Sequence, residues 1–517
     1  MRYFTYTKYI EFSDANFFTV VLLPQKEGTF PTVIFRTPYV QSTVEMPDDE
    51  VKEHCLTAHA QWLSRGYAVV YQHCRGQGKS TGAFVPYIHE REDGLALREW
   101  VRKQPFYNGE LYLCGGSYTA SLHYATAPFE EDVKGAVFEV QDSERYRLWY
   151  RNGQMRKGHA NWHFSLYKNK CNLNKKFTMA SFSERPLQNL SERVLGDRAE
   201  DFEQMLMAPH PLDAFWNTRF GGQDARQAVT EATIPILLTS GYNDFYVGGV
   251  FDMWNSMRAS TKQESALLVS PYNHGDGSCE ESLCFAKGTR SEQFGPAYAI
   301  DWFDHIRKGT SLPFPKGVIT YYRTFEDKWA YDFYGKETQT LCVVLGEGAS
   351  SFRYDPLHPP SFSEEGSFSV EKASKSDYIS VVTKPLDRDV FVKGKMRARL
   401  TVASDCTDSS FYLRISIKKA AYTYVLRHDI TSLGYQLGSY TPKDVVELNF
   451  CFDEYAFLLK KGEQLQIDIA STNDNAYVSH TNQQGAYSLR TDTKIATNTV
   501  WLDRSILEIP VEKKPLL

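Results

Sequence analysis

Strand-like and helix-like patterns of apolar residues alternate over the first 145 residues of the chain. Short continuous apolar runs of this kind are typical of strands that are buried on both faces of a sheet. Two longer segments, 48–66 and 90–105, repeat their apolar residues at helical spacing and end at Gly66 and Pro105. The alternation predicts a mostly parallel α/β sheet. The strand-like runs are TVIFRT (32–37), YAVVYQ (67–72), LYLCG (111–115) and GAVFEV (135–140).

Two changes of pattern divide the rest of the chain. Residues 146–230 are rich in Arg, Asn, Lys, Trp and Leu and contain helical stretches, which predicts a helical insertion. Strand–helix alternation then returns, and after residue 315 short alternating runs are separated by Gly, Asp, Asn and Pro turns, which is typical of an all-β sandwich. We expect an α/β domain from residues 1–145 and 231–315, a helical cap from 146–230 and a β-sandwich from 316–517.

Composition and charge exclude several classes of protein. A chain of 517 residues is too long for one compact core, and its net charge of −5 favours neither nucleic acid nor an anionic membrane as a partner. No run approaches the roughly 18 apolar residues of a spanning helix, and the first residues lack the apolar core of a signal peptide. We therefore expect a soluble, cytoplasmic protein.

The nine cysteines include no CxxC pair, which indicates reduced, structural thiols. Cys55 lies near His54 and His59, but further ligands at a standard spacing are missing. We expect no metal site there.

Ser117 lies where a nucleophile could be displayed. It follows the apolar run 111–115 and precedes a helical pattern, with Gly115 and Gly116 before it and Thr119 and Ala120 after it. Small residues on both sides are the requirement of a nucleophile elbow, the sharp strand-to-helix turn that exposes a serine hydroxyl above a sheet. The sequence GGS is also common in ordinary turns, so the motif alone does not decide between the two.

Two later strand ends supply the partners that a catalytic serine needs. ILLTSG leads into Asp244, and ALLVS leads into His274. Catalytic groups of open α/β sheets gather at the carboxyl ends of strands, and the order Ser117, Asp244, His274 is that of α/β-hydrolases. The combination predicts a Ser-His-Asp triad.

These motifs resemble those of the bacterial cocaine-esterase-like hydrolases. That group also contains X-Pro dipeptidyl-peptidases and α-amino-acid ester hydrolases. The resemblance is dense from about residue 30 to 140 and returns at 234–275. The last 200 residues share with the family's C-terminal jelly roll only the general pattern of short strands and turns. The quoted stretches are PTVIFRTPY (31–39), RGYAVVYQHCRGQGKSTGAF (65–84), GGSYTA (115–120), PHPLDAFW (209–216), GYND (241–244) and PYNH (271–274).

The resemblance implies a role for each residue that matches a family motif. Ser117 would be the nucleophile, His274 the general base and acid, and Asp244 the orienting acid. Tyr39 matches the family tyrosine whose hydroxyl donates to the oxyanion, and the backbone N–H of Tyr118 would be the second donor. A phenol suits this task because it is a neutral donor at pH 7. The resemblance also implies an α/β-hydrolase fold with a C-terminal jelly roll, and no cofactor.

The chain departs from the family pattern at three positions. Ala120 stands where glycine is usual, a change small enough to have little effect. His73 and Cys74 stand before RG where the family has an aspartate, which we expect to alter loop packing and not chemistry. His73 lies on the wrong strand for the usual triad order.

The substrate is less well defined by the sequence. Phe245 and Tyr246 follow Asp244, where amino-ester hydrolases carry carboxylates for the substrate ammonium, so an uncharged acyl group fits better. The cap aromatics Trp149, Tyr150, Trp162 and Phe164 are candidates for the acyl pocket, although we expect most of them to belong to the core of the cap. The carboxylates left for an ammonium are Asp142, Glu144 and Asp276, and we expect these to be solvated or salt-bridged.

The sequence therefore predicts a serine hydrolase that cleaves small esters, or amides of short acyl or peptide substrates, through an acyl-enzyme. One alternative is an aminopeptidase-type acyl hydrolase. Another is a binding protein without catalytic activity, since a fold can be retained when its activity is lost. Neither nucleic acid nor a membrane is an expected partner, and a homo-oligomer is compatible with the sequence.

Overall fold

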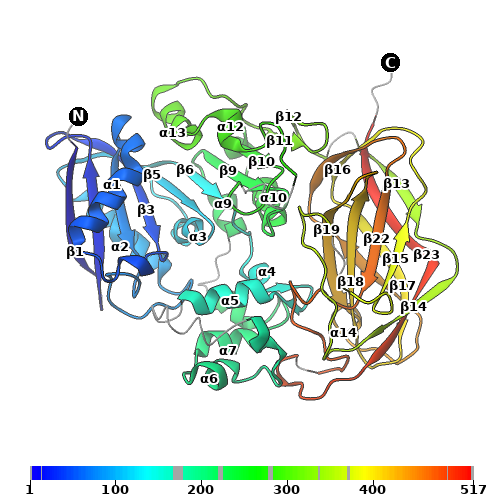
Figure 1. The fold of residues 1–517 in the computed structure, drawn as a ribbon. Coiled ribbons are helices and arrows are strands. Elements are labelled where there is room, and N and C mark those ends of the chain that lie inside the picture. The colour runs from blue at the N-terminus through cyan, green and yellow to red at the C-terminus, as the bar shows by residue number, and fades with distance from the viewer. Residues whose placement is uncertain are drawn as a thin grey trace.

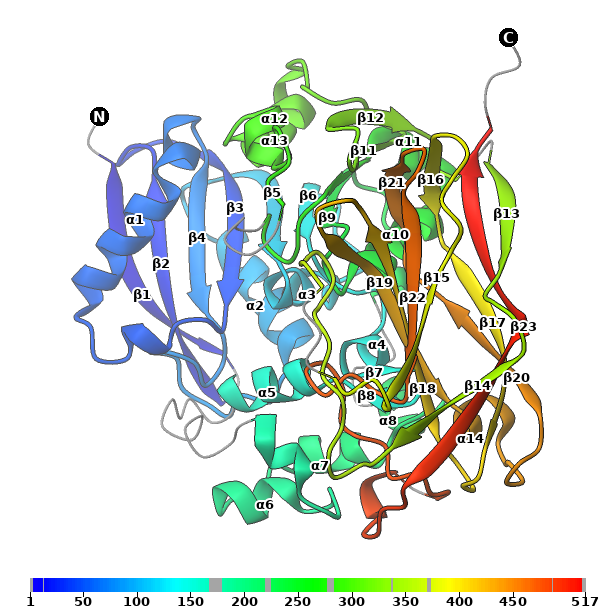
Figure 2. The ribbon, with the colours of Figure 1, turned by 45° about the vertical axis from the view of Figure 1, so that its right-hand side comes forward.

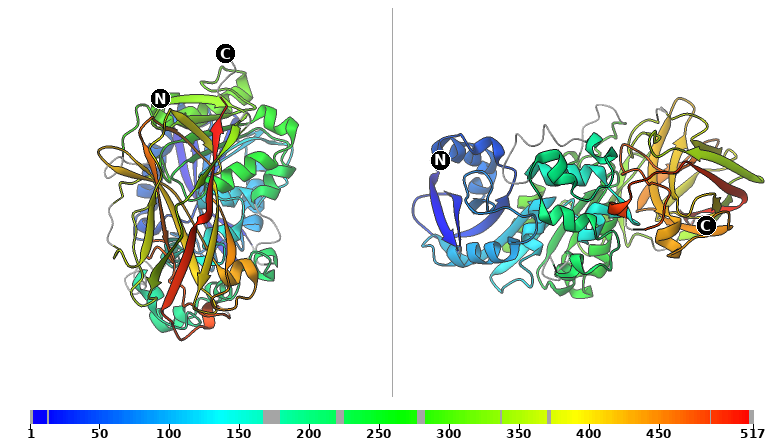
Figure 3. Two further views of the ribbon diagram at one scale, coloured as in Figure 1. Left: turned by 90° about the vertical axis from the view of Figure 1, so that its right-hand side faces the viewer. Right: turned by 90° about the horizontal axis from the view of Figure 1, so that it is seen from below.

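The computed structural model describes residues 3–12, 14–166, 179–218, 225–276, 283–335, 338–369, 373–485 and 487–513. Three parts are visible in Figure 1: an α/β part that contains the N-terminus, a group of helices below it, and a sandwich that contains the last strands. Seen from below, the helical group lies in front of the α/β part, and the sandwich is at one end (Figure 3). No helix in these described ranges is long and apolar enough to cross a membrane.

The α/β part is a ten-stranded sheet in the order β1-β2-β4-β3-β5-β6-β9-β10-β11-β12. The strands from β4 to β11 pair in parallel, and antiparallel strands flank them at both edges. The mostly parallel sheet expected from the sequence is therefore confirmed. The strands are β1 (Phe4–Phe12), β2 (Ala15–Leu23), β3 (Phe30–Thr37), β4 (Ala68–His73), β5 (Tyr107–Gly116), β6 (Val133–Glu139), β9 (Ile236–Gly241), β10 (Ala266–Ser270), β11 (Ile319–Arg323) and β12 (Lys328–Asp332).

Helices cover both faces of this sheet because successive strand residues point to opposite sides. Val20 and Leu22 pack with α1 and α13, whereas Val21 and Leu23 belong to the core shared with α2, α3 and α10. A sheet buried on both faces explains why its strands read as continuous apolar runs. The helices are α1 (Asp48–Ser64), α2 (Glu90–Arg102), α3 (Tyr118–Tyr124), α9 (Ala225–Glu231), α10 (Val247–Ser256), α11 (Ala259–Glu264), α12 (Arg290–Phe294) and α13 (Tyr298–Lys308).

The helical group lies below the carboxyl ends of the parallel strands, and the arrows of β3 and β4 point toward α5 in Figure 2. The stretch ERVLGDRAEDFEQMLM is two helices, because Gly196 adopts a left-handed conformation (φ 70°) that ends the first. The elements are α4 (Arg145–Trp149), β7 (Tyr150–Arg151), β8 (Gln154–Met155), α5 (Lys157–Leu166), α6 (Leu190–Leu195), α7 (Glu200–Leu206) and α8 (Ala214–Thr218).

The C-terminal part is a sandwich of a seven-stranded and a four-stranded antiparallel sheet. The long strand β23 runs through the larger sheet and pairs with β13, β14, β16 and β17. The elements are β13 (Thr338–Val344), β14 (Ala349–Tyr354), β15 (Tyr378–Val382), β16 (Val390–Gly394), β17 (Arg397–Ser404), β18 (Ser410–Lys418), β19 (Thr423–Ser432), α14 (Leu433–Leu437), β20 (Val446–Cys451), β21 (Tyr455–Leu459), β22 (Gln464–Ala470) and β23 (Ala496–Glu512).

The prediction that the sandwich begins at residue 316 was wrong. The run VITYYRTF contributes β11, which pairs in parallel with β10 and continues the α/β sheet to Asp332 at the end of β12. Apolar and aromatic residues suit either kind of sheet, and which strand they pair with depends on contacts distant in sequence.

Candidate active site

Ser117 sits at the sharp turn between β5 and α3. Its backbone is strained, with φ 54° and ψ −133°, and its N–H donates to the carbonyl of Glu139 at 2.9 Å. A non-glycine residue in such a conformation persists only where its surroundings hold it. A Cβ at Gly115 would lie 2.6 Å from the carbonyl carbon and oxygen of Thr119, so this position requires glycine.

Gly116 is under less constraint than the motif suggested. A Cβ there would lie 3.5 Å from the nearest atom, the Cβ of Glu139, which is an ordinary van der Waals contact. Thr119 closes the turn instead, because its hydroxyl accepts the N–H of Gly116 and donates to the carbonyl of the same residue. The turn therefore depends on Gly115 and on the side chain of Thr119.

Asp244 and His274 meet at the ends of adjacent strands. Ser270 pairs with Gly241 at the carboxyl ends of β10 and β9, so the loops that follow run side by side. The Nδ1 atom of His274 lies 3.0 Å from Oδ2 of Asp244. Asp244 is completely buried, and its other oxygen accepts the N–H of Tyr246 at 2.8 Å.

Two aromatic rings hold the His274 imidazole from the side. Phe245 stacks on it with ring centroids 5.2 Å apart and planes inclined by 17°, and Tyr246 meets it edge-on at 5.5 Å. Both aromatic residues line the same cavity as His274. They also restrict the rotation of the imidazole.

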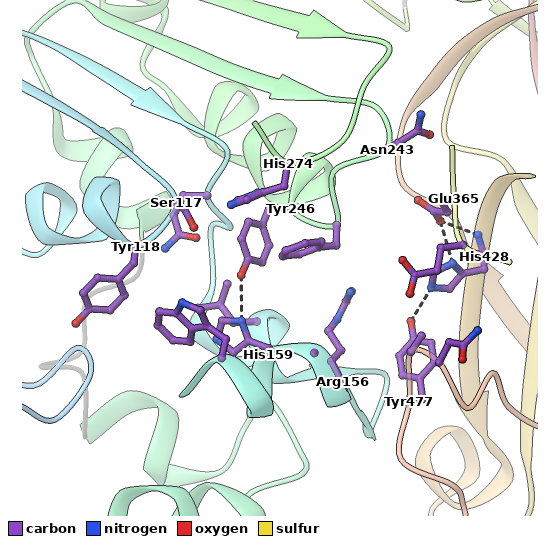
Figure 4. A pocket seen from close by; sticks show the side chains of 18 of the residues that line it. Ser117, Tyr118, Arg156, His159, Asn243, Tyr246, His274, Glu365, His428 and Tyr477 are labelled. Atoms are coloured by element: carbon purple, nitrogen blue, oxygen red, sulfur yellow. Dashed lines mark hydrogen bonds and ion pairs between the residues drawn. The ribbon is translucent and has the colours of Figure 1, made fainter. Parts of the chain in front are cut away.

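Ser117 and His274 line one cavity of about 630 Å³, and the His274 ring is directed toward Ser117 in Figure 4. Because Nδ1 is engaged by Asp244, the other ring nitrogen, Nε2, is the one left for Ser117. The volume is that of a site for a drug-sized molecule.

Tyr39 reaches Ser117 from the loop after β3. Its hydroxyl accepts the indole N–H of Trp162 at 3.3 Å, and it lies near enough to the Ser117 hydroxyl and the Tyr118 backbone N–H for both to lower its pKa slightly. Although 44% of Tyr39 is exposed, desolvation where it lines the cavity raises the pKa of its phenol, so that the group stays protonated.

The side chain of Tyr118 turns away from the reacting groups (Figure 4). It is buried, and its hydroxyl donates to Glu90 and accepts the N–H of Tyr87. Of Tyr118, only the backbone is therefore left for a role beside Ser117.

The cap contributes α5 to the cavity, but not all the aromatic residues that were candidates for it. Trp162 lines it, whereas Trp149 and Tyr150 are buried in the cap outside it. Trp149 packs edge-on against His159 with centroids 4.7 Å apart, and the Tyr150 hydroxyl donates to Met205. Phe164 is likewise cap core, because it packs against Phe202. In a short helix that carries several aromatic residues, the sequence pattern does not distinguish core from cavity lining.

The sandwich forms the far wall of the cavity, and the sequence reasoning identified none of its residues. They lie in the segment before β15, on β19 and in the loop after β22, namely Glu364, Glu365, His428, Asn475, Ala476 and Tyr477. The loop is bound to the cap, since Lys157 and Val478 donate backbone hydrogen bonds to Ala476 and Met155. These residues follow Ser117 by more than 240 positions, and no local motif marks them.

Other polar residues singled out in the sequence lie outside the cavity. Asp142, Glu144 and Asp276 form ion pairs with Arg147, Arg226 and Arg290. His73 is completely buried, and this burial lowers its pKa to about 3. In the described part of the chain, no three His, Cys, Asp or Glu side chains gather as a metal site.

Comparison with known proteins agrees with this architecture. The family profile of X-Pro dipeptidyl-peptidase (S15 family) matches residues 16–276, and that of the X-Pro dipeptidyl-peptidase C-terminal non-catalytic domain matches residues 331–505. The second match begins inside β12, in keeping with the corrected start of the sandwich.

The chain is also similar to individual proteins of known kind. It is 21% identical over 453 residues to the cocaine esterase of Rhodococcus sp. (strain MB1 Bresler), which covers 76% of each chain. Among solved structures, an aminopeptidase from a marine sediment archaeon, Thaumarchaeota archaeon, superposes with a TM-score of 0.79 at 17% identity over 99% of this chain and 97% of that one.

An α-amino acid ester hydrolase superposes with a TM-score of 0.78 at 16% identity, with the same coverage of both chains. At such identities the structural likeness concerns the fold, whereas the S15 profile spans half of the chain. The resemblance inferred from the motifs is confirmed: the chain belongs to the X-Pro dipeptidyl-peptidase (S15) family, and the protein is a hydrolase.

Proposed function

We propose that this protein hydrolyses carboxylic esters of small molecules through an acyl-enzyme formed on Ser117. The observation that carries the proposal is the contact between His274 Nδ1 and Asp244 Oδ2, in a cavity that also displays Ser117 on a strained turn. A serine with a base, and a base with an orienting carboxylate, is the arrangement that acyl transfer requires.

The proposed reaction begins with His274 Nε2, which takes the proton of Ser117 as the hydroxyl attacks the ester carbonyl. The buried carboxylate of Asp244 holds Nδ1–H and stabilises the imidazolium that forms. The imidazolium then gives its proton to the leaving alcohol, and the acyl group stays on Ser117. Water, deprotonated by His274, attacks the acyl-enzyme, and the imidazolium then returns the proton to the Ser117 oxygen as the acid is released.

Tyr39 and Tyr118 would stabilise the oxyanion of each tetrahedral intermediate. The Trp162 indole donates to the Tyr39 oxygen, which leaves the phenol proton free for the substrate oxygen. The Tyr118 N–H is the second donor. Fixed donors of this kind act where charge develops and require little reorganisation during the reaction.

The residues nearest His274 favour ester hydrolysis over the aminopeptidase-type alternative. Phe245 and Tyr246 line the cavity beside His274, where a substrate ammonium would meet aromatic carbon. One observation supports the alternative: Glu364 and Glu365 line the opposite wall. Esters with and without an amino group therefore belong in the substrate series.

The test is intact-mass labelling with a fluorophosphonate, together with hydrolysis of a short-chain 4-nitrophenyl ester. We expect one adduct and turnover on the wild type, and neither on Ser117→Ala. Ser64→Ala removes an exposed serine at the end of α1 and should behave as the wild type. A folded wild type with no adduct and no turnover would reject the proposal.

A further inference from the structure

The cap wall of the cavity carries the guanidinium of Arg156, which forms no ion pair with the described residues. Arg156 precedes the first turn of α5 and lines the cavity. Among the described residues it has neither an ion pair nor a side-chain hydrogen bond, and its Nε is buried without a partner. A buried donor without an acceptor is costly, so such a group is normally satisfied by water or a ligand. In Figure 4 the Arg156 side chain extends from the residue before α5 into the cavity.

His159, one helical turn further along, adds a second donor to the same wall. It is 9% exposed, lines the cavity, and its Nε2 is buried without a partner in the described chain. Its Nδ1 lies 3.0 Å from the Tyr246 hydroxyl, which has no other acceptor among the described residues. The hydroxyl therefore donates to Nδ1, and the proton of the neutral imidazole resides on Nε2.

Two further features favour an acceptor with negative charge at this wall. Burial lowers the pKa of His159 well below its usual value, so the ring acts as a neutral donor beside the Arg156 cation. Gly158 between them is exposed to the cavity in the first turn of α5, where backbone N–H groups lack helical partners.

The carboxylates opposite do not replace this acceptor. Glu365 is bound to Arg427 at 3.0 Å and to the backbone N–H of His428 at 2.8 Å. No ion pair joins Glu364 to Arg156 among the described residues, and desolvation, with a smaller contribution from Glu365, raises the pKa of the Glu364 carboxyl, which makes it a weaker anion. The charged group of the cavity that most needs a partner is thus the Arg156 guanidinium, and its partner would be an anion.

We propose that the substrate carries a carboxylate at its end remote from the scissile bond, held by the Arg156 guanidinium and the Nε2–H of His159. Arginine suits this role because its planar fork binds a carboxylate through two parallel hydrogen bonds. The inference rests on the proposed ester hydrolysis and names the class of ester: the half-ester of a dicarboxylic acid, or an ester whose leaving group bears the acid.

The test compares esters that differ only at the remote end. Monomethyl succinate, methyl butanoate and methyl 4-aminobutanoate carry an anion, a methyl group and an ammonium on the acyl side. For the leaving-group side, 4-acetoxybenzoate is compared with 4-methylphenyl acetate. We expect Arg156→Gln to lower kcat/KM at least ten-fold more for the acidic member of one series than for its neutral partner. Arg156→Lys should recover part of that loss, and Arg198→Gln, an exposed cap arginine, should leave the ratio unchanged.

Equal losses on acidic and neutral esters would overturn the inference, and so would a preference for the ammonium ester that Glu364→Gln abolishes. Binding of the acidic and the neutral ester of each series to Ser117→Ala, measured by calorimetry, is independent of turnover. We expect the acid of one series to bind more tightly than its neutral partner, and Arg156→Gln in that background to abolish this difference. Failure of the wild type on every ester, with this binding intact, would reject the proposed function and retain the site; no binding difference would reject the site.

Discussion

His274 and Asp244 are 30 residues apart in the sequence, yet Nδ1 of one lies 3.0 Å from Oδ2 of the other. The distance follows from the parallel pairing of β9 with β10, which brings their carboxyl ends to the same edge of the sheet. With Asp244 completely buried and its second oxygen engaged by the Tyr246 N–H, the carboxylate cannot turn away from the imidazole.

Asp244→Asn should leave the fold intact and reduce kcat for ester hydrolysis by about 10³- to 10⁴-fold, because the amide no longer fixes the tautomer that His274 needs. Steady-state kinetics on a neutral ester check this. Asp301→Asn on α13, distant from the cavity, serves as the control. A loss of less than ten-fold would mean that another group orients His274.

Tyr39→Phe should reduce kcat by about 10²- to 10³-fold with a smaller change in KM, since the oxyanion donor acts mainly in the transition state. Fluorophosphonate labelling of Ser117 should persist at a lower rate. Tyr331→Phe removes an exposed hydroxyl and should have no effect. A variant with unchanged kcat would exclude Tyr39 from the oxyanion site.

Gly115→Ala and Gly116→Ala should differ sharply, although the residues are neighbours. The new methyl at Gly115 would lie 2.6 Å from backbone atoms of Thr119, whereas at Gly116 the nearest atom is 3.5 Å away. We expect a loss of about 3 kcal/mol or more for the first and less than about 1 kcal/mol for the second. Thermal unfolding of both variants is the measurement, and similar losses would contradict the geometry of the elbow.

Glu454 predicts a dependence of stability on pH. It is 5% exposed between β20 and β21, and burial, with a smaller contribution from Asp453, raises its pKa to about 7 despite Lys395 at 3.5 Å. The folded state therefore holds this proton more tightly than the unfolded chain does. The stabilisation is present below pH 4.5 and is lost as the pH rises to about 7.

Glu454→Gln should consequently stabilise the protein at pH 8 by up to about 3 kcal/mol relative to its effect at pH 4.5. Thermal midpoints of wild type and variant at the two pH values give the comparison. Glu447→Gln, an exposed glutamate on β20, should change neither midpoint. A wild type and a Glu454→Gln variant with the same pH slope would show that Glu454 stays ionised.

Much of the architecture could be predicted from the sequence because its determinants are local. Continuous apolar runs predict buried parallel strands, and strand ends followed by Ser117, Asp244 and His274 predict where their side chains gather. The prediction placed the run VITYYRTF in the wrong sheet. The residues of a strand do not by themselves determine which other strand it pairs with.

The composition of the cavity was decided by the tertiary structure. Ser117 contacts Tyr39 through the packing of separate loops, and the far wall comes from sandwich segments that follow by more than 240 residues. Trp149 and Trp162 have the same chemistry and lie on neighbouring helices, but only Trp162 faces the cavity. The sequence by itself determined the elements and the order of the chemical groups, because these depend on neighbours along the chain. Which groups share one solvent-filled space depends on contacts between distant segments, and only the folded chain decides those.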